Sequence, residues 1–255
     1  MDRLLELTYR AEQSHFWFRG FRWYVRPEIA RAVRGRTAPR LLDCGCGTGS
    51  NLAMLEEFGE VFGFDLTWNG LALARTVGRR NIARASIGSI PFASGYFDVV
   101  TSFDVFQCLP DVVERDAARE MWRVLKPGGH AILNVAALEI LSGGHAVLSE
   151  EVRRYTPQRL RAVFESAGFV IDRLTFAHAS LLPVMLPVRL WQRWRSGGTL
   201  PAGEFDITVP PAAINGLLTA LVGLEAAALR VANMPIGSSL LLHARKLETA
   251  AIPLS

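Results

Sequence analysis

A glycine-rich turn follows a short apolar run early in the chain. The run 41–44 leads into Gly45, Gly47 and Gly49, after which a helix-like pattern begins. Glycines at alternate positions allow a sharp turn and a close approach to a ligand, because no Cβ intervenes and a positive φ is tolerated. The next helix would add unpaired N–H groups at its N-terminus. The stretch therefore predicts a strand, a cofactor-binding turn and a helix.

A carboxylate follows the second apolar run. Residues 60–66 favour a buried strand, and Asp65 stands near its end. A parallel βαβ unit places the ends of the two strands side by side, and an acid there can hold a ribose diol by two hydrogen bonds. An alternative role for Asp65 is to cap the helix that starts near Trp68, since Asp is a favoured N-cap residue. The glycine turn upstream favours the ribose role.

The glycine spacing distinguishes between cofactors. The dinucleotide fingerprint is G-x-G-x-x-G, whereas this chain has G-x-G-x-G preceded by Asp43. With that acid and spacing, the stretch resembles the first motif of class I, Rossmann-like S-adenosylmethionine-dependent methyltransferases, and in particular type 11 methyltransferase domains. The runs 88–98 and 120–129 resemble further pieces of this family in the same order. A NAD-linked reductase is the least favoured interpretation.

The resemblance implies S-adenosyl-L-methionine as the cofactor and a set of residues that hold it. These residues lie in the glycine turn, after the second and third strands, and at the end of the fourth strand. The matching positions are Asp43, Gly45, Cys46, Gly47, Gly49, Asn51, Asp65, Leu66, Ser86, Ile87, Phe103 and Asp104.

Three positions depart from the family's pattern. Ser86 stands where relatives carry an acid that reaches the adenine amino group, and a hydroxyl accepts that hydrogen bond without charge assistance. Gln107 and Cys108 stand where relatives carry Glu and His. Cys108 is a candidate for a reactive thiol, but a role as a small buried hydrophobic residue is favoured. These changes keep open an alternative function, a non-catalytic cofactor-binding protein of the same fold that acts as a partner or regulator.

Alternating apolar runs and helical patterns predict an α/β fold. The resemblance implies a three-layer, doubly wound, seven-stranded, mostly parallel sheet with an antiparallel last strand. We expect an N-terminal helical and aromatic extension over 1–40, a methyltransferase core over 41–178, a helical insertion over 179–235, and a final strand and tail over 236–255. The aromatic residues of 15–24 would pack as core, or form part of a lid over the pocket.

The insertion separates the last two predicted strands, 169–176 and 238–246. Because the sixth strand is parallel, its carboxyl end lies on the cofactor side, so the insertion should cap the active site. Its long apolar segment contains Glu225, which argues against a membrane-spanning helix. Two roles remain: a cap whose Trp191 and Trp194 surround an apolar acceptor, or a peripheral membrane contact whose arginines face phospholipid headgroups. Those arginines are Arg189, Arg193 and Arg195.

Candidate catalytic groups come from the connection after the fifth strand. His145 and Tyr155 lie in this segment, at the rim where ligands of open α/β sheets bind. A neutral His145 could take a proton from an acceptor, although a lone histidine is more often a surface or capping residue. Glu151 stands where a subset of bacterial family members carries a histidine. No His, Cys or carboxylate pair has metal-site spacing, so the sequence predicts methyl transfer without a metal.

Composition narrows the choice of partners. The net charge is +4 and the pI is near 9.3, but the basic residues are scattered and form no stripe for nucleic acid. Three cysteines, an odd number, favour a reducing cytoplasm, and the N-terminus lacks the apolar region of a signal peptide. We therefore expect a cytoplasmic enzyme that methylates a small apolar, lipid-like or natural-product acceptor, with peripheral membrane contact as a further option. The sequence leaves the oligomeric state open.

Overall fold

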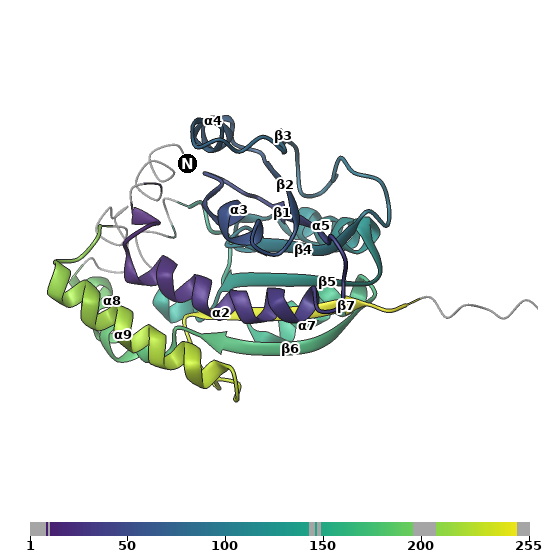
Figure 1. Cartoon of the computed structure of the whole chain (residues 1–255). Helices are drawn as coiled ribbons and strands as arrows, with labels where there is room; N and C mark the ends of the chain where they lie inside the picture. The colour runs from purple at the N-terminus through teal and green to yellow at the C-terminus, as the bar shows by residue number, and fades with distance from the viewer. Residues whose placement is uncertain (1–8, 10, 143–145, 147–148, 196–207, 249–255) are drawn as a thin grey trace, which may run out of the picture.

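The protein is described here by a computed structural model that covers residues 9, 11–142, 146, 149–195 and 208–248 (Figure 1). Strands and helices alternate along most of the chain. In chain order the elements are α2 (Phe16–Ala32), β1 (Arg40–Cys44), α3 (Ser50–Leu55), β2 (Glu60–Asp65), α4 (Trp68–Thr76), β3 (Ile82–Arg84), β4 (Phe97–Phe103), η1 (Phe106–Cys108), α5 (Asp111–Val124), β5 (Leu125–Ala136), η2 (Glu139–Leu141), α7 (Pro157–Ser166), β6 (Phe169–Ala177), η3 (Ala179–Leu181), α8 (Leu182–Arg195), α9 (Ala212–Leu229) and β7 (Ser239–Lys246).

The seven strands form one sheet in the order β3-β2-β1-β4-β5-β7-β6. All pairings among β1 to β5 are parallel, and β7 runs antiparallel to both of its neighbours. Every residue of β4 is buried, because helices cover both faces of the sheet. The predicted α/β fold with an antiparallel last strand is therefore confirmed.

Two apolar cores lie on the two faces of the sheet. One contains side chains of α5 and α7, including Met121 and Phe164. The other contains side chains of α2, α3 and α9, including Ile29, Leu55 and Val222. Burial of these faces leaves the edge formed by the carboxyl ends of the parallel strands as the place for a ligand.

The start of α7 follows from its local sequence. Thr156 is the N-cap residue, its hydroxyl accepts a hydrogen bond from the Arg159 N–H at 3.2 Å, and Pro157 occupies the first turn. Proline suits this position because its missing N–H would have no partner there. Gly168, with a φ of 97°, follows the helix and permits the reversal into β6.

The aromatic N-terminal helix packs as core. In α2, Phe21, Tyr24 and Ile29 are buried against the sheet and the insertion. Phe21 meets Phe103 edge-on, with ring centroids 4.9 Å apart, so the end of β4 is covered by α2. Between the two interpretations of the aromatic block, the structure supports packing for these residues.

The insertion lies beside α2 and beside the end of β5. Helix α9 runs alongside α2 (Figure 1), with Gly20 against Val222 and Gly223 against Trp23. Helix α8 contacts η2, which follows β5. The side chain of Arg189 is buried, so the prediction that it faces phospholipid headgroups is wrong; the side chains of Arg193 and Arg195 lie outside the described residues.

Candidate functional site

Three carboxylates gather at one edge of the sheet. Asp65 ends β2, Asp43 lies in β1 and Asp104 follows β4, and these three strands are neighbours. The strand order reverses between β1 and β4, and ligands of open α/β sheets bind at such a switch point. The topology therefore brings together acids that are far apart in sequence.

The glycine turn presents bare backbone at this switch point. Gly45, Gly47 and Gly49 have φ values of 84°, 50° and 76°, which other residues rarely adopt. A Cβ on Gly45 would lie 2.3 Å from Cγ2 of Val105, so no side chain fits there. The N–H groups of Gly45 and Cys46 donate to the carbonyl of Phe64 at 2.8 and 2.9 Å, which holds the turn against the end of β2. This cradle fits a ligand that approaches the backbone closely.

The Asp65 carboxylate connects the glycine turn to the loop after β2. Oδ2 accepts from the Gly47 N–H at 2.8 Å, and Oδ1 accepts from the N–H and the hydroxyl of Thr67. Thr67, and not Asp65, is the N-cap residue of α4. A carboxylate has about four acceptor sites, and three are used here. Both hydroxyls of a ribose could therefore bind only if one of these internal bonds is exchanged.

Asp43 is buried between β1 and β4. Its Oδ1 accepts from the Thr101 hydroxyl at 2.7 Å. Burial raises the pKa of the Asp43 carboxyl to about 7, and the nearby charge of Asp65 acts in the same direction. The side chain thus joins the two strands at the switch point.

Asp104 has a left-handed backbone, with a φ of 59°. Its carboxylate accepts from the side-chain amides of Asn134 at 2.9 Å and Gln107 at 3.5 Å. Desolvation by the surrounding protein raises the pKa of this carboxyl to about 6, and the negative charge of Glu151 raises it further. Strained residues of this kind concentrate at functional sites.

Gln107 connects Asp104 to the end of β5. Its amide nitrogen reaches Asp104, and its carbonyl oxygen accepts from the Ala136 N–H at 3.4 Å. A glutamate in this buried position would set a second negative charge beside Asp104. The amide supports the acid without that repulsion.

The remaining predicted cofactor residues lie around the same edge. Ser86 forms a tight turn in which its hydroxyl accepts from the Gly88 N–H at 3.3 Å, and the next side chain, Ile87, is buried. Leu66 is exposed, as an apolar side chain beside an adenine would be before binding. Cys46 and Phe103 are buried, and Asn51 is half-buried on α3. Their contacts with a cofactor stay predictions.

The two predicted catalytic residues are placed differently. His145 lies outside the described residues. Tyr155 is buried, and its hydroxyl donates to the Glu114 carboxylate near the junction of α5 and α7. Burial is the main cause that raises the pKa of the Tyr155 hydroxyl, followed by the Glu114 carboxylate. This environment gives Tyr155 a structural role, and a catalytic one stays a prediction.

Cys108 is not placed as a reactive thiol. Its sulfur lies 3.1 Å from the Ser149 carbonyl oxygen, to which the S–H donates. Burial raises the pKa of the thiol to about 12, so it stays protonated. Reactive cysteines have lowered pKa values, so the structure argues against a reactive thiol; the side chain is half-buried, where a fully buried hydrophobic residue was favoured.

His178, directly after β6, was not among the predicted site residues. It is fully buried with a φ of 58°, stacked on Trp17 at 3.9 Å and edge-on to Tyr24 at 4.9 Å. Neither ring nitrogen has a hydrogen-bond partner among the described residues. Burial lowers its pKa to about 3, so the ring is neutral. Its position at the carboxyl end of a strand was the only signal in the sequence.

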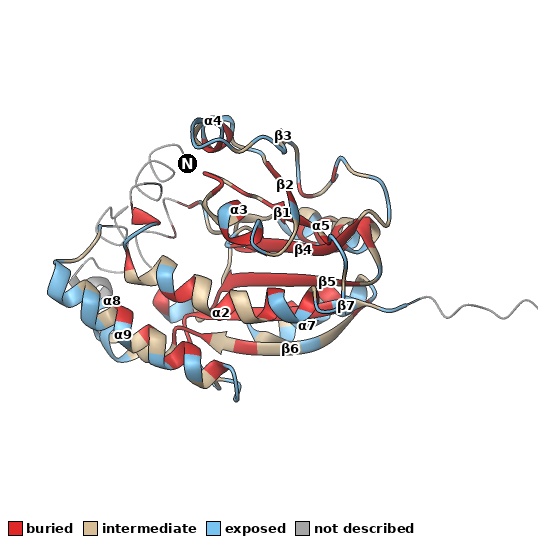
Figure 2. Ribbon diagram, in the orientation of Figure 1, coloured by how far each residue is buried: buried red, intermediate tan, exposed pale blue. Residues whose placement is uncertain are grey.

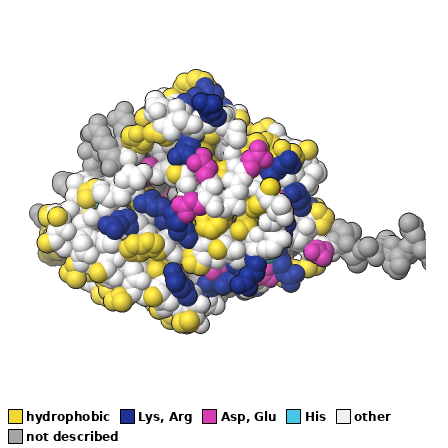
Figure 3. Space-filling model, in the orientation of Figure 1, with side chains coloured by type: hydrophobic (Ala, Val, Ile, Leu, Met, Phe, Trp, Pro, Cys, Tyr) yellow, Lys and Arg dark blue, Asp and Glu magenta, His cyan; other side chains and the backbone are white. Residues whose placement is uncertain are grey.

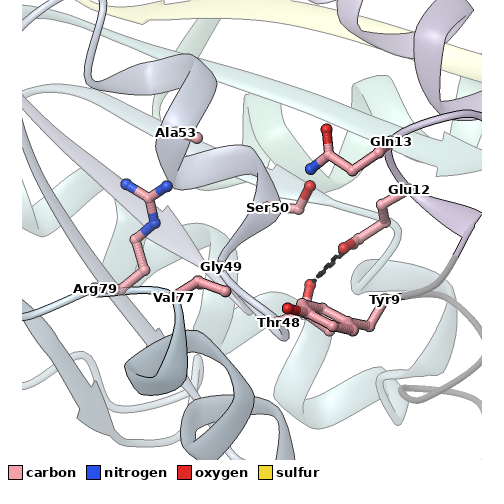
Figure 4. Close-up of a pocket in the computed structure, with 9 residues that line it drawn as sticks. All are labelled: Tyr9, Glu12, Gln13, Thr48, Gly49, Ser50, Ala53, Val77 and Arg79. Carbon is pink, nitrogen blue, oxygen red and sulfur yellow. Dashed lines mark hydrogen bonds between the residues drawn. The ribbon is translucent and has the colours of Figure 1, made fainter.

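A cavity of about 340 Å³ lies on the outer side of the glycine turn (Figure 4). Glu12 forms part of its wall, and its carboxylate accepts a hydrogen bond from the Thr48 hydroxyl, which lies 2.9 and 2.8 Å from the two carboxylate oxygens. Burial raises the pKa of the Glu12 carboxyl. The cavity shares only Gly49 with the predicted cofactor residues. Its lining residues are Tyr9, Glu12, Gln13, Thr48, Gly49, Ser50, Ala53, Val77 and Arg79.

A histidine pair lies on the strands away from this edge. The ligand atoms of His130, Asp172 and His243 fall within 4.8 Å of one another. Both nitrogens of His243 are already used, by Glu28 at 2.7 Å and by His130 at 3.0 Å, and Asp172 accepts from Arg245. The contacts account for the cluster without a metal, and metal-independent transfer stays a prediction.

Comparison with known proteins now identifies the core. A profile of the family described as "Methyltransferase domain" matches residues 42–133. These residues are a methyltransferase domain. The match begins just before Asp43 and ends in β5, so it includes the glycine turn and all three carboxylates.

The names of two curated relatives of the methyltransferase domain refer to quinone biosynthesis. The ubiquinone/menaquinone biosynthesis C-methyltransferase UbiE of Vibrio cholerae is 30% identical over 172 residues, which cover 52% of this chain and 65% of that protein. The demethylmenaquinone methyltransferase of Listeria monocytogenes is 33% identical over 118 residues, which cover 41% of this chain and 47% of that protein. The chain thus matches less than two thirds of the length of either relative.

Solved structures share the fold of the methyltransferase domain. A chain from the complex between the Haloferax volcanii Trm112 methyltransferase activator and a methyltransferase aligns with a TM-score of 0.61 at 18% identity, over 96% of this chain and 94% of that one. Geranyl diphosphate methyltransferase in complex with GPP and sinefungin aligns with a TM-score of 0.55 at 16% identity, over 87% and 76%. The profile match and the curated relatives confirm the predicted class I methyltransferase family, whose cofactor is S-adenosyl-L-methionine.

Proposed function

We propose that the protein is an S-adenosylmethionine-dependent methyltransferase for a small, apolar, lipid-like acceptor. The observation that carries this proposal is the arrangement at the switch point, where Asp65 holds the bare glycine turn and Asp104 stands opposite on the next strand but one. The turn fits a ligand that needs close backbone contact, and the acids fit a ligand with hydroxyl groups and positive charge.

The residues of this edge would hold and orient the two reactants. When bound, S-adenosyl-L-methionine supplies a methyl group on a positively charged sulfur. Asp65 would hold the ribose in exchange for one of its internal bonds, and the glycine turn would approach the remainder of the cofactor. Alignment of nucleophile and methyl group is the main requirement, since proximity alone lowers the barrier by several kcal/mol. We retain His145 as the candidate base, because the connection after β5 leaves the sheet at this edge.

The aromatic core formed by α2 reaches the carboxyl edge of the sheet. Trp17, Phe21 and Tyr24 of α2 face the ends of β4 and β6, where they meet Phe103 and His178. The relatives named above act on quinones, which are apolar rings with lipid tails. A prenylated quinol is therefore the first acceptor to test, with transfer to a ring carbon.

The test separates binding from catalysis. Calorimetry with S-adenosylhomocysteine should show binding by the wild type, and incubation with labelled cofactor and a short-chain prenylated quinol should transfer the label. No binding would contradict the proposal. Binding without turnover on a broad acceptor panel would favour the non-catalytic alternative, in keeping with the changes at Ser86, Gln107 and Cys108.

A matched pair of variants tests the base. His145→Gln should reduce turnover while S-adenosylhomocysteine still binds, whereas Tyr155→Phe should leave turnover per folded molecule unchanged. The reverse result would move the catalytic role to Tyr155.

A further inference from the structure

Helix α9 is apolar on its outward side as well as on the side that packs into the core. Its 18 residues have a mean hydropathy of 1.7, yet only 28% of them are buried. Its three polar side chains, Asn215, Thr219 and Glu225, lie on the side that faces the protein. An ordinary surface helix also packs apolar residues inward, but it carries its polar residues outward.

Two of the three inward polar side chains of α9, Asn215 and Glu225, are held by hydrogen bonds. Asn215 accepts from the Phe16 N–H and donates to the Ser14 carbonyl, both at 2.9 Å. The Glu225 carboxylate accepts from the N–H groups of Ala179 and Ser180 at 2.9 and 2.8 Å. These bonds fix the rotation of α9 about its axis, so its outward face is set by the fold.

The outward face is apolar along the whole helix and just beyond it. Leu217, Leu224 and Val231, spaced by seven residues, are 70%, 71% and 87% exposed, and Ile214 is exposed beside them. Alanines fill the outward positions between them. Between 212 and 229 no charged side chain lies on this face, because Glu225 is buried.

Helix α8 extends the same kind of surface. Trp194 is 80% exposed, and Val184, Val188, Leu190 and Trp191 are exposed as well. Ten of the nineteen exposed large apolar side chains of the described residues fall between 184 and 236. Since η3 contacts both α8 and α9, the two helices belong to one region.

Basic side chains border this apolar face. Arg19, Arg22 and Arg26 follow one another on α2 around Trp23, which contacts α9 at Gly223. Arg230, exposed, directly follows α9. Arg26 shares its charge with Glu57. Figure 3 shows hydrophobic side chains gathered at the lower left, where α9 lies in Figure 1, with Lys and Arg side chains beside them.

We propose that the outward face of α8 and α9 docks on a membrane surface that contains anionic phospholipids. An uncharged apolar face with a basic border matches the acyl boundary and headgroups of such a bilayer, and exposed tryptophans are typical of that interface. A spanning arrangement would strip Glu225 and Asn215 of their partners, which is costly in a bilayer. The helix therefore lies in the interface plane.

A second copy of the chain is the competing occupant. Helix pairs in solution use charged side chains beside an apolar seam to set register and orientation. Within α9 the structure shows no exposed charged residue to serve this purpose. The basic border would moreover face a like-charged border in a symmetric pair, so the lipid surface is favoured.

Vesicle flotation tests this inference, which goes beyond the proposed activity and is measured without an acceptor. At low salt, wild-type protein should float with phosphatidylcholine vesicles that contain phosphatidylglycerol and bind less to phosphatidylcholine alone. Leu217→Gln with Leu224→Gln should reduce binding about a hundredfold or more, because two large apolar side chains would no longer enter the acyl boundary. Val112→Gln with Leu247→Gln, two exposed apolar positions elsewhere, should leave it unchanged.

Fold and oligomeric state complete the test. S-adenosylhomocysteine affinity and Tm should be the same in both double variants, which shows that the fold is intact. No binding of the wild type to anionic vesicles, or equal binding of the Leu217→Gln, Leu224→Gln variant, would overturn the inference. So would light scattering that shows a wild-type dimer separated by these two substitutions without vesicle binding, because the face would then be a subunit interface.

Discussion

Asp65 shows how one carboxylate can organise a site before a ligand arrives. Its two oxygens hold the Gly47 N–H and both donors of Thr67, so the glycine turn and the loop after β2 are fixed relative to each other. Pre-positioned groups lose less entropy on binding. The internal bonds are also the ones that a ribose diol must compete with.

Gly47→Val is expected to abolish binding of S-adenosylhomocysteine in calorimetry. Gly47 belongs to the turn that the cofactor is expected to approach closely, and its φ of 50° disfavours a β-branched residue by about 1–2 kcal/mol. Gly95→Val is the matched control, because Gly95 has a φ of 68° with open space around it and lies away from the site. Equal loss of binding in both variants would show that backbone strain, and not the cradle, is responsible.

Gln107→Glu is expected to make cofactor binding pH-dependent. A second carboxylate near Asp104 raises the pKa of Asp104 above its present value of about 6. The S-adenosylhomocysteine affinity should then fall near neutral pH and recover as the pH rises and Asp104 ionises. Gln107→Met removes the hydrogen bond without adding charge, and an identical pH profile for the two variants would contradict the electrostatic explanation.

At the scale of elements, α5 and α7 meet through a buried polar cluster. The Tyr155 hydroxyl donates to Glu114, which also pairs with Arg159 at 2.7 Å. The segment before α7 thereby anchors to α5. This segment connects the carboxyl end of β5 to α7. Because it starts at the edge where ligands bind, its position in the sequence suggested a catalytic role for Tyr155.

Tyr155→Phe is expected to lower the free energy of unfolding by about 1–3 kcal/mol, because the buried Glu114 loses a donor. Urea denaturation measures this loss. Calorimetry with S-adenosylhomocysteine should give the wild-type affinity. Unchanged stability combined with a large loss of methyl transfer would instead support the catalytic prediction for Tyr155.

At the scale of the whole molecule, two surfaces are candidates for function: the carboxyl edge of the sheet and the outward face of the insertion. The carboxyl edge of the sheet holds the acids. The insertion leaves the outward side of α9 exposed beside α2 (Figure 2). His178 lies between these regions, buried under α2 with both nitrogens unpaired. Its protonation would require the surrounding packing to open, so it links stability of the whole fold to pH.

His178→Asn is expected to make the protein less sensitive to acid. The folded pKa of His178, about 3, lies below the unfolded value near 6.5, so the unfolded state binds the proton first and stability is lost as the pH falls between these values. Relative to the wild type, the variant should gain up to about 1.4 kcal/mol per pH unit below pH ~6.5. Asn tolerates the positive φ.

Asp43 and Asp104 also titrate between pH 3 and pH 7, and the comparison of wild type with His178→Asn isolates the contribution of His178. The raised pKa values of Asp43 and Asp104 give the opposite slope, because the folded state binds those protons first. The difference between the two urea-denaturation profiles removes these shared contributions. A constant difference from pH 7 to pH 5 would show that His178 does not titrate as described.

The amino-acid sequence by itself determined the fold, the cofactor class and the position of the glycine turn. These follow from local signals, since alternating apolar runs and glycine spacing act over a few neighbouring residues. Only the tertiary structure decided the surroundings of Tyr155, Arg189, His178 and α9. Each depends on which way a side chain points and on what packs against it, and those contacts come from residues far away in sequence. The apolar composition of α9 is visible in the sequence. The contacts with α2 and η3 decide that Asn215 and Glu225 face the protein.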